Sequence, residues 1–426
     1  MKRWIAAAFA ALPSIACAEG IDTGDTAWML TSTALVLFMT LPGLALFYGG
    51  LVRTKNVLSV LMQCFGIACV VSVLWVLVLY SLTFGSGGPF IGGLSKAMFS
   101  GVGEDALSGT IPETVFAMFQ LTFAIITPAL VVGGFAERMR FGAMLLFSVL
   151  WVLVVYAPVC HWVWASDGWL FKRGLLDFAG GTVVHITAGV GALVAALTLG
   201  KRQGFPTTPM LPHNMTMTVT GAGMLWVGWF GFNAGSAVAA NGNAGMAMLV
   251  THVSAAAGAC AWTAMEWIRY GKPSALGLVT GMVAGLGTIT PASGYVGPGG
   301  ALIIGAVAGF LCFNATNFLK RKLGVDDSLD VFPVHGVGGM LGTLAAGIFA
   351  SDALGVFSGQ GYAEGQTMGG QMGVQAIGVA ATVAWTAIAT AILLRVVGLV
   401  TPLRPTTDNE TVGLDQVEHN ERGYDL

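Results

Sequence analysis

The sequence has 426 residues, of which 55% are hydrophobic and only 9% are charged. A soluble domain carries about 25% charged residues, so this composition excludes an ordinary soluble protein, and its hydrophobicity excludes intrinsic disorder. Nineteen basic and twenty-one acidic residues give a net charge of −2, which excludes the basic face that nucleic-acid binding requires. The composition predicts an all-α integral membrane protein, in which the 61 glycines favour close helix packing.

Residues 1–18 have the pattern of a cleaved secretory signal peptide. Lys2 and Arg3 precede an apolar run, and Ala16-Cys17-Ala18 supplies a cleavage pattern of small residues. The run is too short to cross a hydrocarbon core of about 30 Å. A lipoprotein signal around Cys17 remains an alternative. Cleavage after Ala18 would place the mature N-terminus on the outer, periplasmic side.

The rest of the chain contains long apolar runs bounded by charged or turn residues. We expect eleven membrane spans, near residues 27–51, 57–84, 112–136, 141–164, 177–199, 213–236, 244–268, 274–290, 297–318, 333–350 and 373–399. The eighth and tenth runs are short and rich in glycine. Residues 19–400 would form one membrane domain.

An odd number of spans with the N-terminus outside puts the C-terminus in the cytoplasm. The distribution of basic residues gives an independent test, because cytoplasmic loops are rich in Lys and Arg. Thirteen of the nineteen basic residues fall in the expected inner loops and tail, Arg395 lies near the inner end of the last expected span, three fall in outer loops and two in the signal. The tail, residues 401–426, carries six acids and two arginines. It is interpreted either as a disordered solvated end or as a cytoplasmic docking surface for a regulator.

Two expected spans share a pattern of an aspartate, a later histidine and a glycine four residues after the histidine. They are Asp177, His185 and Gly189 in the fifth span, and His335 and Gly339 in the tenth, with Asp330 just upstream of it. Because five is odd, a second copy of five spans would be inserted upside down. The sequence therefore predicts an inverted 5+5 repeat plus a C-terminal helix, with a substrate path near the pseudo-two-fold axis.

His185 and His335 are the ionisable residues that we expect deepest in the membrane. His185 lies about eight residues into its expected span, which at 1.5 Å per residue is about 12 Å. Ionisable groups at such positions are costly and usually functional. Two adjacent neutral imidazoles can share an N–H···N hydrogen bond and relay a proton, while an apolar surrounding disfavours a charged occupant. A plain interhelical hydrogen bond is the alternative.

His161 and His252 lie in the fourth and seventh expected spans without repeat partners, so packing or interhelical bonding is the simpler interpretation. A haem held by two histidines is an enzymatic alternative, but no other feature of the sequence indicates redox chemistry. The six cysteines include no C-x-x-C pair. We therefore predict no cofactor, no metal site and no enzymatic activity.

Aromatic residues mark a second candidate site. Trp164 ends the fourth expected span and Ser236 ends the sixth on the same, outer side. An indole face and a hydroxyl would suit a small cation that donates hydrogen bonds, because a desolvated cation–π contact is worth about 2 kcal/mol. Phe119 with Phe123 and Trp229 with Phe232 stand at helical spacing, which core packing would also explain.

Four internal motifs stand out, namely DFAGGTVVH at 177–185, ALFYGGL at 45–51, GWFGFNAGS at 228–236 and DVFPVHG at 330–336, with GLD at 413–415, Glu418-His419 and Tyr424 in the tail. They resemble the Amt/Mep/Rh ammonium transporter family, and specifically its bacterial Amt branch. The likeness runs from about Asp25 to the end of the chain.

This resemblance implies a homotrimer of eleven-helix protomers in the bacterial inner membrane, each with its own pore for ammonium or ammonia. It also implies roles for particular residues, listed here. They are Trp164, Phe123 and Ser236 for the outer ammonium site, Phe123 and Phe232 for a phenyl gate, His185 and His335 for the paired histidines, Asp177 for a supporting acid, and Trp229 and Thr290 for further pathway positions. The inner face and tail would dock a PII-type signal protein.

Some positions depart from the family pattern. Pro333 stands where we expect glycine, and Lys172 and Arg173 add positive charge to an outer loop. Two other functions stay open. An ammonium sensor would be expected to carry a signalling domain after the last span, and a gas channel of the Rh type would lack the pair Trp164 and Ser236. Whether ammonia alone or ammonia with its proton crosses the pore is not decided by the sequence.

Overall fold

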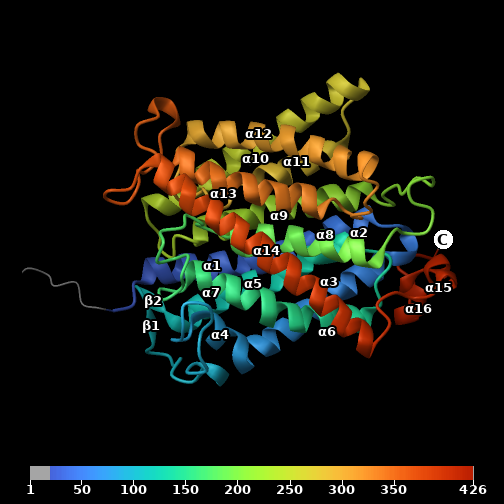
Figure 1. The fold of residues 1–426 in the computed structure, drawn as a ribbon, viewed down its shortest axis with the longest axis horizontal. Helices are drawn as coiled ribbons and strands as arrows, with labels where there is room; N and C mark the ends of the chain where they lie inside the picture. Colours follow the sequence, from blue (N-terminus) through green and yellow to red (C-terminus); the bar gives the residue numbers. More distant parts are fainter. Residues whose placement is uncertain (1–19, 426) are drawn as a thin grey trace, which may run out of the picture.

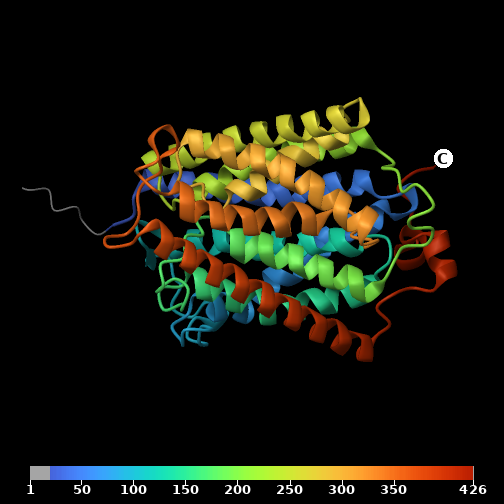
Figure 2. The same cartoon turned by 45° about the horizontal axis from the view of Figure 1, so that its top comes forward.

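The computed structural model describes residues 20–425. The expected signal peptide, residues 1–18, lies outside the described residues. The described chain is a bundle of long helices whose axes run in roughly the same direction (Figures 1 and 2). A short hairpin of β1 (Leu107–Ser108) and β2 (Ile111–Pro112) lies at one end of the bundle, called here the hairpin end. The helices α15 (Thr407–Val412) and α16 (Leu414–His419) lie at the opposite end, called the tail end.

Nine helical segments of the described chain are long and apolar enough to cross a membrane. They are Thr23–Leu51, Thr54–Phe84, Glu113–Phe135, Phe141–Trp164, Gly181–Leu199, Gly242–Tyr270, Pro298–Lys322, Phe332–Phe349 and Met368–Val400. Each corresponds to one expected span, with ends that differ by a few residues. The chain is therefore a multi-span membrane protein.

Several of these segments are built from more than one helix. The first contains α1 (Thr23–Phe38) and α2 (Ala45–Leu51), the second α3 (Val57–Leu74) and α4 (Tyr80–Phe84), the fourth α6 (Phe141–Trp151) and α7 (Ala157–Trp164), and the fifth and eighth end in α8 (Thr187–Leu199) and α13 (Gly338–Phe349). The others are α5 (Glu113–Phe135), α10 (Gly242–Tyr270), α12 (Pro298–Asn317) and α14 (Met368–Val400). Short π-helical turns join the paired helices.

The sixth and eighth expected spans correspond to α9 (Met215–Gly235) and α11 (Ala275–Ile289). Their starts are fixed locally by side chains that accept backbone N–H groups: Asn214 accepts from Met217 and Ser274 accepts from Gly277. The helix α11 has only 15 residues. It is apolar but shorter than an ordinary span, because the chain turns at Thr290 inside the bundle.

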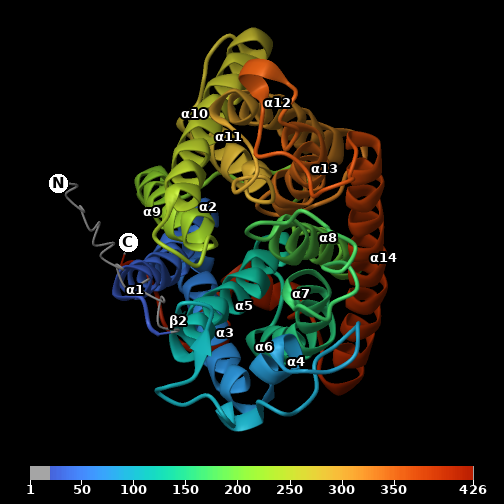
Figure 3. The same cartoon turned by 90° about the vertical axis from the view of Figure 1, so that its left-hand side faces the viewer.

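The view along the bundle shows how the helices pack (Figure 3). α10, α11 and α12 pack together on one side, while α3, α5 and α6 pack together on the other. The helix α14 runs along the outside against α6, α8 and α13. Large apolar side chains such as Ile388 and Leu399 on α14 are exposed, as expected for a surface that faces lipid.

The tail is folded onto the tail end of the bundle. Asp415 accepts hydrogen bonds from the backbone N–H groups of Leu58 (3.0 Å) and Ser59 (2.7 Å), in the first turn of α3. Lys55 donates to the carbonyl oxygens of Glu410 and Thr411. These bonds satisfy helix-end groups that would otherwise lack partners. Residues 401–425 are therefore ordered against the bundle, and the interpretation of the tail as a disordered end is wrong for them.

Candidate functional site

Two stacked phenyl rings lie near the hairpin end of the bundle. The ring centroids of Phe123, on α5, and Phe232, on α9, are 4.2 Å apart with planes inclined by 28°. The indole of Trp164, at the end of α7, meets Phe123 edge-on at 5.6 Å. Both phenyl rings are buried, whereas Trp164 is half-buried. Three separate helices thus bring the half-buried indole of Trp164 against the buried, stacked rings of Phe123 and Phe232.

The polar atoms around these rings are held by backbone groups. The Trp164 indole Nε1–H donates to the carbonyl oxygen of Asp177 at 2.9 Å. The Ser236 hydroxyl, one turn after Phe232, donates to the Phe232 carbonyl oxygen at 2.8 Å. A hydroxyl that donates its only proton to the backbone keeps its lone pairs for another donor. The half-buried Ser236 oxygen is therefore an acceptor near the phenyl rings.

Asp177 is buried and serves the helix that carries His185. Its carboxylate accepts backbone N–H groups from Gly180 (2.9 Å) and Thr182 (2.8 Å), together with those of Gly181 and Val183, and also the Thr182 hydroxyl. Burial raises the pKa of Asp177, and the donors around it oppose that shift. The side chain thus caps the start of the helix that carries His185.

The two candidate histidines meet inside the bundle. Nδ1 of His185 lies 3.2 Å from Nδ1 of His335, and the ring centroids are 5.2 Å apart. Both rings are buried. Each histidine sits in a π-helical turn, η6 (Gly181–Ile186) or η8 (Phe332–Val337), that opens its span. The helix begins at Gly181, so His185 is the fifth helical residue and lies closer to the helix start than the sequence led us to expect.

Glycines allow the two histidine-bearing segments to approach. A Cβ atom added to Gly189 would lie 2.2 Å from the Gly336 nitrogen, and one added to Gly339 would lie 2.9 Å from the His185 Cβ. No side chain fits at such distances, because real Cβ contacts below 3.0 Å essentially never occur. The glycine that follows each histidine by four residues therefore has a packing role at the crossing of the two segments.

The acid that corresponds to Asp177 in the second segment is Asp327 rather than Asp330. Asp327 precedes His335 by eight residues, as Asp177 precedes His185, and its carboxylate accepts the Phe332 N–H at 2.7 Å. Asp330 instead pairs with Lys320. The sequence analysis paired Asp177 with Asp330, the aspartate nearer to His335. The equal spacing of eight residues between acid and histidine would have identified Asp327 as the cap.

A narrow apolar cavity of about 10 Å³ lies between Phe232 and the two histidines. Such a volume holds about one water-sized molecule. It is lined by Phe232, Trp229 and both histidines among other, mainly aliphatic, residues. The indole of Trp229 stacks on His185 with centroids 5.6 Å apart and donates to the Thr290 hydroxyl at 2.9 Å. Trp229 thus forms part of the wall beside the histidines, and Thr290 holds its indole from behind.

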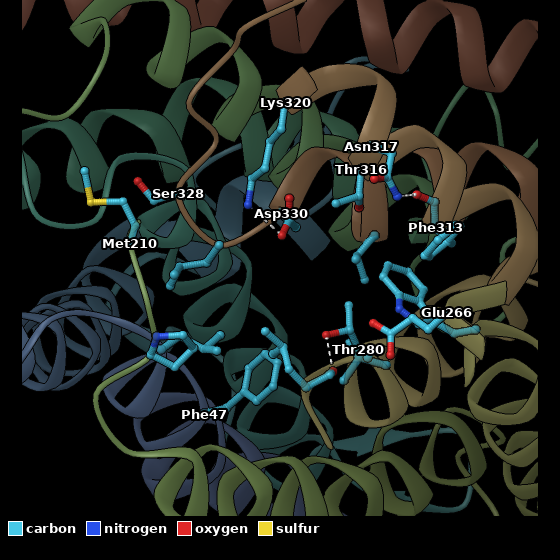
Figure 4. Close-up of a pocket in the computed structure, with 18 of the residues that line it drawn as sticks. Phe47, Met210, Glu266, Thr280, Phe313, Thr316, Asn317, Lys320, Ser328 and Asp330 are labelled. Atoms are coloured by element: carbon cyan, nitrogen blue, oxygen red, sulfur yellow. Dashed lines mark hydrogen bonds and ion pairs between the residues drawn. The ribbon is translucent and has the colours of Figure 1, made fainter. Parts of the chain in front are cut away.

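His335 also reaches a larger cavity of about 240 Å³ at the tail end. Figure 4 shows Phe47, Glu266, Thr280, Lys320 and Asp330 around this opening. The sequence analysis did not single out Lys320 or Glu266. The two cavities share His335, so together they extend from Phe232, past the two imidazoles, to the polar groups at the tail end.

The remaining predicted positions lie outside these cavities. Both ring nitrogens of His161 lie 2.8 Å from backbone carbonyl oxygens, those of Thr83 and Gly88. His252 stacks near Trp226 with centroids 5.1 Å apart. Pro333 stands in the first turn of its helix, where a missing N–H has no intrahelical partner to lose. Within residues 20–425 no group of three metal-ligating side chains comes together.

Comparison with known proteins assigns the chain to a protein family. A model described as the Ammonium Transporter Family matches residues 27–424. The chain belongs to the ammonium transporter family. An ammonium transporter of Bacillus subtilis is 48% identical over 406 residues, covering 95% of this chain and 99% of the relative. An ammonium transporter of Archaeoglobus fulgidus is 44% identical, covering 95% and 100%.

Solved structures agree with the family. The crystal structure of Saccharomyces cerevisiae Mep2 is 38% identical, has a TM-score of 0.83 and is matched over 91% of each chain. A protein described as a sensor Amt protein is 29% identical, has a TM-score of 0.85 and is matched over 93% of this chain and 98% of its own. The curated relatives carry the names of transporters, in agreement with the expectation of a non-enzyme that handles ammonium.

Proposed function

We propose that this bacterial-type ammonium transporter recruits the ammonium cation at Trp164, Phe123 and Ser236 and conducts ammonia past a phenyl gate and a histidine pair. The observation that carries the proposal is the order of groups along the path. A partly open indole comes first, then two buried stacked rings, then an apolar cavity of about 10 Å³ beside two imidazoles. Each group faces the next at contact distance.

The proposed mechanism solves a selection problem. Ammonium and potassium are similar in size, but only ammonium donates hydrogen bonds and only ammonium can lose a proton. The aromatic faces offer a cation about 2 kcal/mol each, and Ser236 offers an acceptor that only a donor can use. The apolar cavity beyond the rings disfavours any bare ion by several kcal/mol. Ammonium can shed its charge before that cavity, whereas potassium cannot.

The two imidazoles of His185 and His335 offer hydrogen-bonding nitrogen atoms to a molecule in the cavity while both rings remain uncharged. Two neutral imidazoles joined at 3.2 Å share one N–H, so each outer nitrogen can face the lumen as donor or acceptor. Among the described residues, His185 Nε2 has no hydrogen-bond partner. Ammonia, which both donates and accepts, matches this surface. A proton could follow along the imidazoles, and the current measurement below distinguishes the two cases.

We infer the membrane arrangement from the same family. Eleven spans, formed by the nine long segments with α9 and α11, would be arranged as an inverted 5+5 repeat plus α14. The tail end would face the cytoplasm of a bacterial inner membrane, after removal of residues 1–18. Three chains would form a homotrimer with one pore each. The tail, residues 401–426, would be a regulatory surface that docks a PII-type signal protein.

The test is a current measurement on purified protein in liposomes on a solid-supported membrane. An ammonium jump should give a transport current or, with neutral conduction, an internal pH rise without current, while a potassium jump should give neither. The variants F123A and F232A should admit potassium. An absence of both ammonium signals in a folded wild-type protein would refute the proposal and favour a sensor.

A further inference from the structure

The cavity of about 240 Å³ at the tail end is lined by a positively charged side chain, that of Lys320. Nζ of Lys320, on the π-helical turn η7 (Phe318–Lys322) that ends α12, donates to Oδ2 of Asp330 at 2.8 Å. Both side chains are about a quarter exposed. Lys320 and Asp330 line the same 240 Å³ cavity as His335 (Figure 4). The ion pair therefore stands where a molecule leaving the histidine pair enters this cavity.

Asp330 is the acid of this cavity that keeps one carboxylate oxygen without a hydrogen-bond partner among the described residues. Glu266 also lines the cavity, but its carboxylate already accepts the N–H (2.7 Å) and the hydroxyl (3.1 Å) of Ser274. By contrast, the Oδ1 atom of Asp330 is buried and has no partner within residues 20–425. The same holds for the Thr316 hydroxyl in the cavity wall. Figure 4 shows Asp330 and Glu266 reaching the opening from different sides.

The backbone holds Asp330 in this position. Its φ angle is +60°, in a region that residues other than glycine seldom adopt. Asp327 caps the helix just after it, and Lys320 is fixed by the end of α12. The pair thus joins the end of α12 to the loop just before η8.

We propose that Lys320 is a tethered competitor that keeps free ammonium from binding Asp330 at the inner mouth. A lysine head group is an alkylammonium ion, so it makes the same charge-assisted N–H···O bonds to a carboxylate as the transported cation. Attached by a short flexible chain, it presents an effective concentration in the millimolar range or above. Ammonia that leaves the pore and takes up a proton then passes Asp330 without being retained.

This inference rests on the proposed transport of ammonium and adds a consequence of its own. In the wild-type protein, ammonium inside the vesicle should reduce inward transport only by lowering the driving gradient. In the variant K320M, Asp330 is left without its lysine, and internal ammonium should bind there and hold back turnover. The internal concentration that halves the initial rate should fall about fivefold, as for a partly exposed ion pair of ordinary strength.

The experiment uses full-length protein in liposomes preloaded with a series of ammonium chloride concentrations, with sidedness set by access to a C-terminal tag. Initial rates after an external ammonium jump are compared at equal internal loading, so the gradient is the same for every variant. Lys322, an exposed neighbour on the same segment without an ion pair among the described residues, supplies the matched control K322M. K320R, which keeps the cation, is the second control.

Three outcomes would support the proposal together: a shifted internal dependence in K320M, wild-type behaviour in K322M and K320R, and restoration in K320M/D330N. An unchanged internal dependence in folded K320M would overturn it, and so would complete loss of transport in folded K320M, because a competitor is not required for conduction. If K320M does not fold, D330N must keep the wild-type dependence, and a shift there would also overturn it. A wild-type protein without ammonium transport would instead refute the proposed function.

Discussion

Replacing Gly189, where α8 crosses the segment that carries His335, should disturb the histidine pair more directly than any other substitution proposed below. A Cβ atom at this position would lie 2.2 Å from the Gly336 nitrogen and 2.3 Å from its Cα. Both neighbours are backbone atoms of the segment that carries His335, so the strain cannot be relieved by turning a side chain. In G189A, η8 must move away from α8 or the helices must distort.

The size of the effect follows from these distances. Ordinary carbon contacts begin near 3.5 Å, so the segments must separate by about 1 Å. Overpacking of this kind destabilises a protein by about 1–3 kcal/mol. The 3.2 Å contact between the histidine nitrogens would lengthen beyond hydrogen-bond range. We therefore expect G189A to lower the melting temperature and to change ammonium transport even where the protein folds.

The assay combines a thermal unfolding curve in detergent with ammonium and potassium currents from liposomes. Gly223, on α9, is the matched control, because a Cβ there would meet no atom within 4 Å. G223A should keep the wild-type currents and gain slightly in stability from the helix preference of alanine, which is about 1 kcal/mol. Wild-type stability and currents in G189A would refute the packing argument.

Three further predictions concern the rest of the path and the tail. F232A should remove one ring of the stacked pair and let potassium carry current, which a potassium jump measures. Asp327 is buried with a pKa raised to about 7, so its folded state binds more protons than the unfolded chain. Wild-type stability should then fall as the pH rises from about 4 to 7, and this fall should be smaller in D327N when melting temperatures are compared. D415A should lose the cap on α3, lower stability by about 1 kcal/mol and expose the tail to limited proteolysis.

The sequence predicted the positions of the membrane helices well because each span is a long apolar run that ends at charged or turn residues. Where a polar side chain decides the start, the prediction was less accurate. The fifth helix begins at Gly181, since Asp177 caps its first turn from outside. The tail illustrates the opposite limit. Its order depends on bonds from Asp415 and Lys55 to distant parts of the chain, which no local pattern encodes.

The candidate site was partly readable because the residues that line the path carry unusual chemistry for a membrane helix. His185, His335 and Trp164 stand out as polar or amphipathic groups in apolar runs. Lys320 and Glu266 stand near the ends of two apolar segments, Pro298–Lys322 and Gly242–Tyr270, where a charged residue is ordinary and does not stand out. Their importance appears only when the helices α2, α10, α11 and α12, the turn η8 and two loops come together around one cavity.

The two histidine segments are built alike, and their difference lies in what surrounds the capping acid. Asp177 and Asp327 each precede a histidine by eight residues and cap a π-helical turn, so both segments open in the same way. At the hairpin end the neighbouring groups are aromatic faces and a hydroxyl acceptor, with which a cation can interact. At the tail end the neighbouring acid already holds a lysine. In the proposed function, the capping acids at the two ends match, but only the hairpin end offers groups that bind a free cation. Ammonium would then bind at the hairpin end and leave at the tail end.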